Sequence, residues 1–337
     1  MRTRITSTHR IFLVLLALVS MILAGCGKPM ADKLVVYCYD SFASDWGLGP
    51  AVIPAFEKAT GIKVELVAAG DAGQALARVI DERARPLADV LIGVDNHILP
   101  KALEAKVFES YRPSGWEMVP EGFVLDEAWR ITPFDWGSFA IIWDKAKLEN
   151  PPRSLEELTR PEYARKLIIM DPRTSTPGYG FLAWTKAVYG DGMAEYWKRL
   201  KPSILTMSPG WDTGYGLFTA GEAPLVVSYT TSPAYHAEYE EPGRYEALIF
   251  PEGHPVQIEG AAIVRGSKRR AAARAFLDFM LSEAFQKEVP LTNFMYPILE
   301  DTTLPASFEY APRPLVDLRI APEKLVGAEA AALDALR

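Results

Sequence analysis

The chain has 337 residues, with 36 Lys and Arg against 43 Asp and Glu, and its net charge at pH 7 is −7. Removing residues 1–25 would take away three arginines and leave 33 basic residues against 43 acidic ones. An acidic surface of this kind repels the phosphates of DNA and RNA, so we expect no nucleic-acid partner. The same charge suits a small cationic ligand.

The N-terminus has the features of a targeting segment rather than of a folded domain. Three arginines precede an apolar run over 11–23 that is too short for a membrane span. The small residues that follow lead to Cys26, and this pattern resembles the lipobox of bacterial lipoproteins. The resemblance implies a signal peptide over 1–25, lipidation of Cys26, a tether over 26–32 and a periplasmic or cell-surface lipoprotein. The alternative is an ordinary signal peptide with an incidental cysteine.

The cysteine count limits both stabilisation and catalysis. Only Cys38 accompanies Cys26, so we expect no intramolecular disulfide in the mature chain. Cys38 lies within the β-rich run VVYCY, which favours a buried strand thiol over a nucleophile. The 312 residues from Cys26 onward can bury a large core and are predicted to form two lobes rather than one.

The first predicted elements alternate between strand and helix. Strands are predicted over 33–39, 62–67 and 88–94, with helices over 50–60 and 74–85. This order is typical of a parallel sheet with helices on its faces. Ligands of such sheets meet the loops at the carboxyl ends of the strands, where Asp40, Gly70-Asp71 and Asp95-Asn96 lie.

The rest of the chain extends this pattern into a second lobe and back. The predicted elements are a long strand (132–148), a helix start (151–158), strands (166–170 and 225–229), helices (178–189 and 194–200), two extended runs within 245–267, helices (268–281 after Ser267, and 283–289 after Ser282) and a C-terminal surface helix (324–337). We predict an α/β, two-lobed hinged fold in which each lobe has a central β-sheet flanked by helices. Lobe 1 comprises 33–131 plus 257–337, lobe 2 comprises 132–256, and the chain crosses between them twice.

The stretch DPRTSTPG (171–178) predicts a helix that starts at the end of a strand. Thr176 is the expected N-cap and Pro177 the first helical residue, where its missing N–H costs nothing. Because a helix start carries free N–H groups and partial positive charge, it favours an anion. The hydroxyl of Ser175 adds to this interpretation, and Gly178 would let a ligand approach the backbone. The alternative is a plain capped helix.

The stretch VSYTTSPAYH (227–236) has the same pattern. The predicted strand ends at Tyr229, Thr230 and Thr231 follow, and Ser232 is the expected N-cap before Pro233. Two strand ends in one lobe therefore present hydroxyls and a helix start. We expect both to face one cleft.

Aromatic residues outside apolar runs suggest a cage for a cation. Trp46, Trp136 and Trp211 each lie between an Asp and a Gly, and Tyr229, Tyr235 and Phe294 border polar stretches. Aromatic faces attract cations, and carboxylates add to the attraction. The candidate carboxylates are Asp40, Asp45, Asp71, Asp95 and Asp135.

Metal binding and catalysis have weaker support. His97, His236 and His254 lack metal-ligand spacing, and no nucleophile elbow, P-loop or dinucleotide fingerprint occurs. Ferric iron bound by two tyrosinates remains an alternative. Adjacent tyrosines often serve iron, whereas Tyr229 and Tyr235 are six residues apart.

Seven blocks of sequence resemble the periplasmic thiamine-binding proteins of bacterial ABC importers, a group of extracytoplasmic solute-binding proteins. The blocks are YCYDSFASDWGLGP (37–50), ADVLIGVDN (88–96), PFDWGSFA (133–140), DPRTSTPGYG (171–180), GWDTGYGLF (210–218), SYTTSPAYH (228–236) and NFMYP (293–297). They run in the family's order from about residue 33 to about residue 300. The resemblance implies a two-lobed fold that closes on thiamine, thiamine monophosphate or thiamine diphosphate.

The resemblance also implies roles for individual residues. Asp71 and Ala72 would contact the body of thiamine, and Ser175 and Thr176 would hold the phosphate or hydroxyethyl end. Trp211 would pack against the ligand, and Tyr229, Thr230, Thr231 and Ser232 would supply ring and hydroxyl contacts. The positions that would line the pocket are Tyr39, Trp46 and Tyr235, with Phe294 where the family is expected to have a Trp.

The function implied is that of a ligand-capturing subunit without catalysis or cofactor. It would be a monomer, held to the membrane by lipid on Cys26, that delivers its ligand to an ABC permease and its ATPase. The alternatives are ferric iron or a polyamine on the same fold, and a thiamine-degrading enzyme that uses Cys38.

Overall fold

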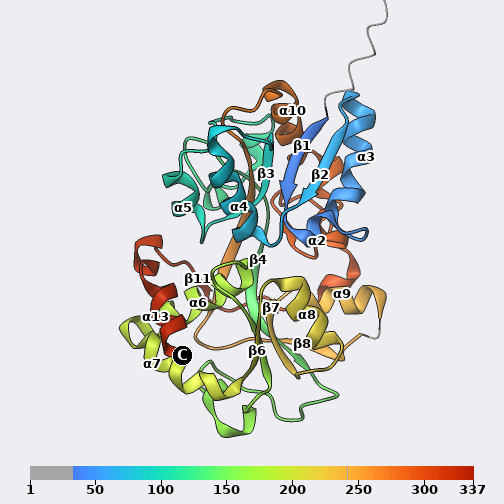
Figure 1. Ribbon diagram of the computed structural model, residues 1–337. Coiled ribbons are helices and arrows are strands. Elements are labelled where there is room, and N and C mark those ends of the chain that lie inside the picture. The colour runs from blue at the N-terminus through green and yellow to red at the C-terminus, as the bar shows by residue number, and fades with distance from the viewer. Residues whose placement is uncertain (1–32, 241) are drawn as a thin grey trace, which may run out of the picture. The chain divides into compact units, whose positions relative to one another are not determined.

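A sheet of parallel and antiparallel strands forms the centre of the fold (Figure 1). The computed structural model describes residues 33–240 and 242–337. The strand order is β2-β1-β3-β9-β4-β7-β5-β6, with β8 and β10 paired to β4 and β11 paired to β9. The strands are β1 (Leu34–Cys38), β2 (Val64–Ala68), β3 (Val90–Asp95), β4 (Thr132–Asp144), β5 (Leu167–Met170), β6 (Ile204–Ser208), β7 (Leu225–Tyr229), β8 (Tyr245–Leu248), β9 (His254–Ile263), β10 (Tyr296–Pro297) and β11 (Asp317–Leu318).

Helices flank the strands in both halves of this order. The α-helices are α2 (Asp40–Ala43), α3 (Leu48–Thr60), α4 (Ala72–Asp81), α5 (Leu99–Glu104), α6 (Thr176–Tyr189), α7 (Met193–Leu200), α8 (Trp211–Thr219), α9 (Ser232–Tyr239), α10 (Arg270–Met280), α11 (Glu283–Gln286), α12 (Val289–Thr292) and α13 (Ala328–Ala335). Short 3₁₀ turns connect them at Glu82–Ala84, Trp116–Met118, Glu121–Phe123, Glu157–Thr159, Pro161–Tyr163, Gly190–Gly192, Lys201–Ser203, Ala306–Tyr310 and Pro322–Leu325.

Parallel pairing places the carboxyl ends of the strands at common edges. β1 is parallel to both β2 and β3, and β5 is parallel to both β6 and β7. The two long strands β4 and β9 are antiparallel to each other and join the two parallel groups. Every residue of β9 is buried, which is why its sequence is largely apolar.

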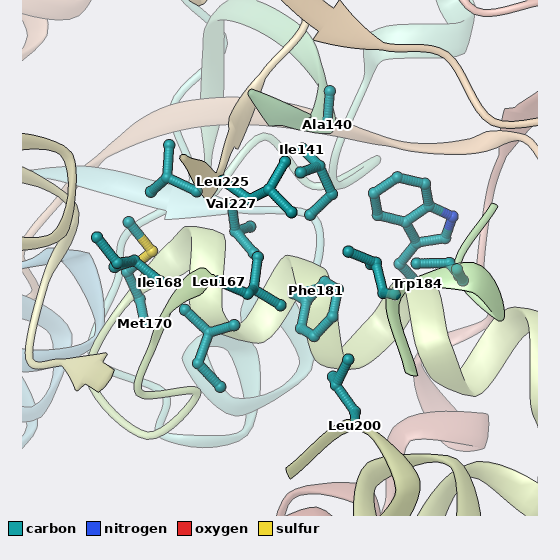
Figure 2. Close-up of a cluster of buried hydrophobic side chains, with 14 of the residues drawn as sticks. Ala140, Ile141, Leu167, Ile168, Met170, Phe181, Trp184, Leu200, Leu225 and Val227 are labelled. Carbon is teal, nitrogen blue, oxygen red and sulfur yellow. The ribbon is translucent and has the colours of Figure 1, made fainter. Parts of the chain in front are cut away.

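Apolar side chains fill the core on each side of this junction. In Figure 2, Leu167, Ile168 and Met170 of β5 lie near Leu225 and Val227 of β7, in one cluster with Phe181 and Trp184 of α6. All seven are fully buried. A second cluster packs β1 and β3 against α3 and α10. These cores support the strands whose C-terminal ends lead into the loops of the site.

Most predicted elements are confirmed, and several details are corrected. The helix expected over 151–158 is absent apart from a 3₁₀ turn, and Asp40 begins the short helix α2 rather than a loop. Arg269, not Ser267, precedes α10; the Ser267 hydroxyl instead accepts a hydrogen bond from the Arg269 N–H. The prediction missed strand β6 and helices α5 and α8. Among the described residues, no helix has the length and apolar character needed to cross a membrane.

His254 is held as a neutral ring by two backbone partners. Its Nδ1 lies 2.7 Å from the Phe139 carbonyl oxygen, and its Nε2 accepts the Phe250 N–H at 2.8 Å. A proton added at Nε2 would break the second bond. Burial lowers the pKa of His254 below its usual 6.5, against an opposing effect of the Phe139 bond. The unfolded chain therefore takes up this proton first, so the stability that neutral His254 contributes is present above about pH 6.5 and is lost as the pH falls.

An NMR titration of the folded protein tests this assignment. The His254 ring should stay neutral, with its proton on Nδ1, at pH values where a free imidazole is already half protonated, near pH 6.5. A His254 midpoint at or above 6.5 would contradict the assignment.

Candidate ligand-binding cleft

A cavity of about 510 Å³ opens where the two parallel strand groups meet, within the size range of small-molecule sites. It brings together eleven of the thirteen predicted ligand-binding residues. Ser175 and Thr230 do not line it, although their chain neighbours do. The lining consists of Tyr39, Ser41, Ser44, Trp46, Asp71, Ala72, Thr176, Pro177, Trp211, Asp212, Tyr215, Gly216, Thr219, Tyr229, Thr231, Ser232, Tyr235, Glu240, Gln257, Glu259, Asn293, Phe294 and Met295.

Four helices begin at this cavity. Their first residues, Ala72 of α4, Thr176 of α6, Trp211 of α8 and Ser232 of α9, all line it. Each helix start contributes backbone N–H groups and partial positive charge to this region, and Asp71 accepts the first N–H of α4 and of α8. The cavity can therefore stabilise negative or hydroxyl-bearing groups without a basic side chain.

Asp71 joins two of these helix starts. Its Oδ1 accepts the N–H of Ala72 at 2.7 Å, and its Oδ2 accepts the N–H of Trp211 at 3.1 Å. With Gln74 it also forms a reciprocal capping box on α4. Burial raises the pKa of Asp71, while the hydrogen bonds from the N–H groups of Ala72 and Trp211 act in the opposite direction.

The starts of α6 and α9 differ from the prediction by one residue. Ser175, not Thr176, is the N-cap of α6, and Thr231, not Ser232, is the N-cap of α9. Neither caps its helix through its side chain, and both prolines occupy the first turn. Both helices begin one residue earlier than predicted. The residue before each proline already belongs to the helix, so the proline is not the first helical residue.

Gly178 serves packing rather than ligand approach. A Cβ at this position would lie 2.6 Å from the Met170 carbonyl oxygen and 2.8 Å from the backbone of Asp171. Backbone atoms of the preceding strand and turn therefore occupy the space that the sequence analysis reserved for a ligand. The requirement for Gly comes from the close contact between α6 and β5.

Hydrogen bonds at Ser228 and Tyr229 hold the rings of Trp211 and Tyr229 in place. The Ser228 hydroxyl accepts from Trp211 Nε1 at 2.8 Å and lies 2.7 Å from the Ser232 hydroxyl. The Tyr229 hydroxyl donates to Gln257 Oε1 at 2.7 Å. Thr231 is buried, and its hydroxyl has no partner within the described protein. This hydroxyl is free to bond a ligand at the start of α9.

The Thr176 hydroxyl and the Thr230 N–H, in contrast, are bonded within the protein. The Thr176 hydroxyl donates to Asp95 Oδ2 at 3.0 Å, so its remaining capacity toward a ligand is as an acceptor. Thr230 is fully buried, and its N–H donates to the Ser138 carbonyl. Ser175 is also buried.

Aromatic rings form the walls of the cavity. Trp211 stacks on Tyr215 with centroids 4.8 Å apart, and Phe294 meets Tyr235 edge to face at 5.3 Å. Trp46 is 53% exposed and also lines the cavity. Trp136 does not line it. It packs between Phe123 and Tyr296 instead, so the predicted cage loses one of its three tryptophans.

The charged residues that line the cavity are all acidic. They are Asp71, Asp212, Glu240 and Glu259, with no Lys or Arg among the described lining residues. Of the predicted carboxylates, Asp40, Asp45, Asp95 and Asp135 do not line the cavity. Glu259 was not among the predicted residues, although an acid within the apolar run of β9 is a signal for a buried functional carboxylate.

Cys38 lies apart from this cavity. It is fully buried, and its Sγ–H donates to the Val67 carbonyl at 3.8 Å. Burial raises the pKa of the thiol to about 12, which leaves almost no thiolate at neutral pH. Over residues 33–240 and 242–337, no group of three His, Cys, Asp or Glu could hold a metal ion.

Comparison with known proteins identifies the family of this chain. Residues 85–323 match the family model of bacterial extracellular solute-binding proteins. The chain belongs to this family. It is 44% identical to the thiamine-binding periplasmic protein of Salmonella typhimurium strain LT2, over 89% of this chain and 91% of the relative, and 44% identical to that of Brucella melitensis biotype 1, over 86% and 87%.

The family's fold is the one described above. A solved periplasmic thiamin-binding protein superposes with a TM-score of 0.87 at 41% identity, covering 92% of this chain and 98% of that one. The predicted α/β periplasmic-binding-protein fold and the predicted resemblance are therefore confirmed. Cys26 and the segment 1–25 lie outside the described residues.

Proposed function

We propose that this solute-binding protein captures thiamine in the cleft and delivers it to the permease of an ABC importer. The observation that carries the proposal is the lining of the cavity, which combines aromatic walls with four carboxylates and no Lys or Arg among the described residues. Thiamine carries a fixed thiazolium charge and a flat aminopyrimidine. A cation suits aromatic faces and carboxylates, and a flat ring suits stacking.

Each part of thiamine has a complementary group. Trp211, Tyr39 and Tyr229 would provide ring contacts, and Asp71 with Ala72 would contact the thiamine body. The hydroxyethyl end, or the phosphates of thiamine monophosphate and diphosphate, would lie at the starts of α6 and α9. There, helix N–H groups and the partnerless Thr231 hydroxyl can bond oxygen atoms.

We propose one lobe of 33–131 and 257–337 and a second of 132–256, with the C-terminal helix α13 packed against α6 and α7 of the second. Among the hydrogen bonds that would then cross between lobes at the cleft are those from the Trp211 N–H to Asp71 and from the Thr176 hydroxyl to Asp95. Both would open if the lobes moved apart. Closure around the ligand would expel water and present one surface to the permease.

We also propose a setting for this function from the sequence of the N-terminal segment. Export to the periplasm is the property of the family, and lipid on Cys26 would keep the protein near the permease and its ATPase. We further propose that the protein acts as a monomer.

Catalysis is not part of the proposed function. A thiamine-degrading enzyme would need a reactive nucleophile in the cleft, and Cys38 is buried in the strand core with a pKa of about 12. Thiamine should remain intact after long incubation with the protein and a nucleophilic amine.

Tryptophan fluorescence tests the proposal because Trp46 and Trp211 both line the cavity. Thiamine and its two phosphates should quench the emission saturably, with one site per chain. Spermidine in excess should not compete, and ferric citrate should give no visible tyrosinate band. Absence of any response to the three thiamine forms would overturn the proposal, and a tyrosinate band would favour iron.

A further inference from the structure

Three carboxylates stand in one row across neighbouring strands. Glu259 of β9 is the register partner of Asp95 on β3 and of Asp135 on β4. Like charges directly opposite each other on a sheet repel. All three side chains are buried, so water does not screen this repulsion.

Asp95 is well supplied with donors. Its Oδ1 accepts the N–H of His97 at 2.6 Å and of Ile98 at 3.1 Å, and its Oδ2 accepts the Thr176 hydroxyl. Both oxygens of Asp95 therefore have donors within the protein.

Asp135 and Glu259 have few hydrogen-bond donors. Asp135 accepts one hydrogen bond, from Asn293 Nδ2 at 2.6 Å, and Glu259 Oε2 lies 3.3 Å from the Tyr39 hydroxyl. The second oxygen of each carboxylate has no partner among the described residues. Neither residue takes part in an ion pair within the described part of the chain. Ionising both of these buried carboxylates at once has a high free-energy cost.

The groups that face this pair do not relieve it. Asp95 comes from β3, Asp71 from the start of α4, Tyr39 from the end of β1 and Tyr229 from β7, and all are acidic or neutral. Burial raises the pKa of Asp135 to about 8, and burial followed by the charge of Asp135 raises the pKa of Glu259. Glu259 is 5% exposed and lines the cavity, whereas Asp135 is fully buried and does not line it.

We propose that Asp135 and Glu259 share one exchangeable proton at neutral pH, and that Glu259 selects ligands with a fixed positive charge by losing this proton to solvent when they bind. The ligand's charge would take the place of the proton as the partner of the second carboxylate charge. This inference rests on the proposed function, because thiamine is the cation used to test it. It makes Glu259 a specificity-determining residue and Asp135 a positioning residue that acts through it.

Isothermal titration calorimetry with thiamine, in two buffers of different ionisation enthalpy, counts the protons released. At pH 7 the wild-type protein should release up to about one proton per thiamine bound. Its affinity should rise between about pH 6 and pH 8, by up to about tenfold per pH unit for one linked proton. Glu259→Gln should lower the affinity by about tenfold or more at pH 8 and abolish the release.

Two further variants separate the pair from a simple contact. Asp135→Asn should also reduce the proton release, although Asp135 does not line the cavity. Asp212→Asn changes an exposed carboxylate of the lining and should leave the release in place. If either pair variant fails to fold, the proton count and pH slope of the wild-type protein remain decisive.

The outcomes distinguish this inference from the proposed function. Thiamine binding with no proton release and no pH dependence would overturn the inference alone. No thiamine binding at any pH would overturn both. Loss of the release in Asp212→Asn with retention in Glu259→Gln would assign the proton to Asp212 and contradict the inference.

Discussion

Replacing Trp211 by alanine is expected to weaken thiamine binding about 100-fold, which corresponds to about 2.7 kcal/mol. The ring is positioned in advance by its stack on Tyr215 and by the bond from Nε1 to the Ser228 hydroxyl. A ring held in this way binds a flat cation without losing rotamer freedom. Titration of the variant by calorimetry measures the loss, since its fluorescence signal would change with the mutation.

Trp116→Ala provides the matched control. Trp116 is half-buried like Trp211, packs on Trp129 with centroids 6.0 Å apart and does not line the cavity. We expect its affinity for thiamine to equal that of the wild type. Equal losses in the two variants would show a general effect on the fold and would contradict the role of Trp211.

Trp184→Ala is expected to lower the free energy of unfolding by about 4 kcal/mol. Trp184 is fully buried on α6 (Figure 2). Its ring centroid lies 4.6 Å from that of His254 and 5.6 Å from that of Phe250. Its removal leaves a cavity in the core that supports β5 and β7, from which the loops of the cleft start. Guanidinium unfolding followed by circular dichroism gives the change.

The control for this loss is Trp46→Ala. Trp46 is the most exposed tryptophan of the cleft, and its truncation should change the free energy of unfolding by less than about 1 kcal/mol. The expected contrast is a large stability loss with Trp184 and a small one with Trp46. Similar midpoints for both variants would contradict the placement of Trp184 in the core.

The strands around the cleft could be predicted from the sequence because local residue patterns determine where these strands begin and end. Apolar strands followed by polar residues predicted β1, β3, β5 and β7 within two residues at each end. Parallel pairing then placed their carboxyl ends together, as expected for such sheets. Eleven of the thirteen predicted site residues line the cavity for this reason.

The features that the sequence did not predict depend on distant partners. Helix α8 contains Gly214 and Gly216, which disfavour a helix in isolation, and its first N–H is bonded by Asp71 from another part of the chain. Trp136 has the same Asp-Trp-Gly context as Trp46, yet it packs on the ring of Tyr296. The pairing of Glu259 with Asp135 appears only once β4 and β9 are in register.

A crystal structure of the protein with thiamine tests the central claim most directly. The ligand should lie in the cavity with a ring against Trp211, its cationic part beside Glu259 and its hydroxyethyl end at the starts of α6 and α9. Thiamine bound elsewhere, or a cavity that stays empty at saturating thiamine, would contradict the account.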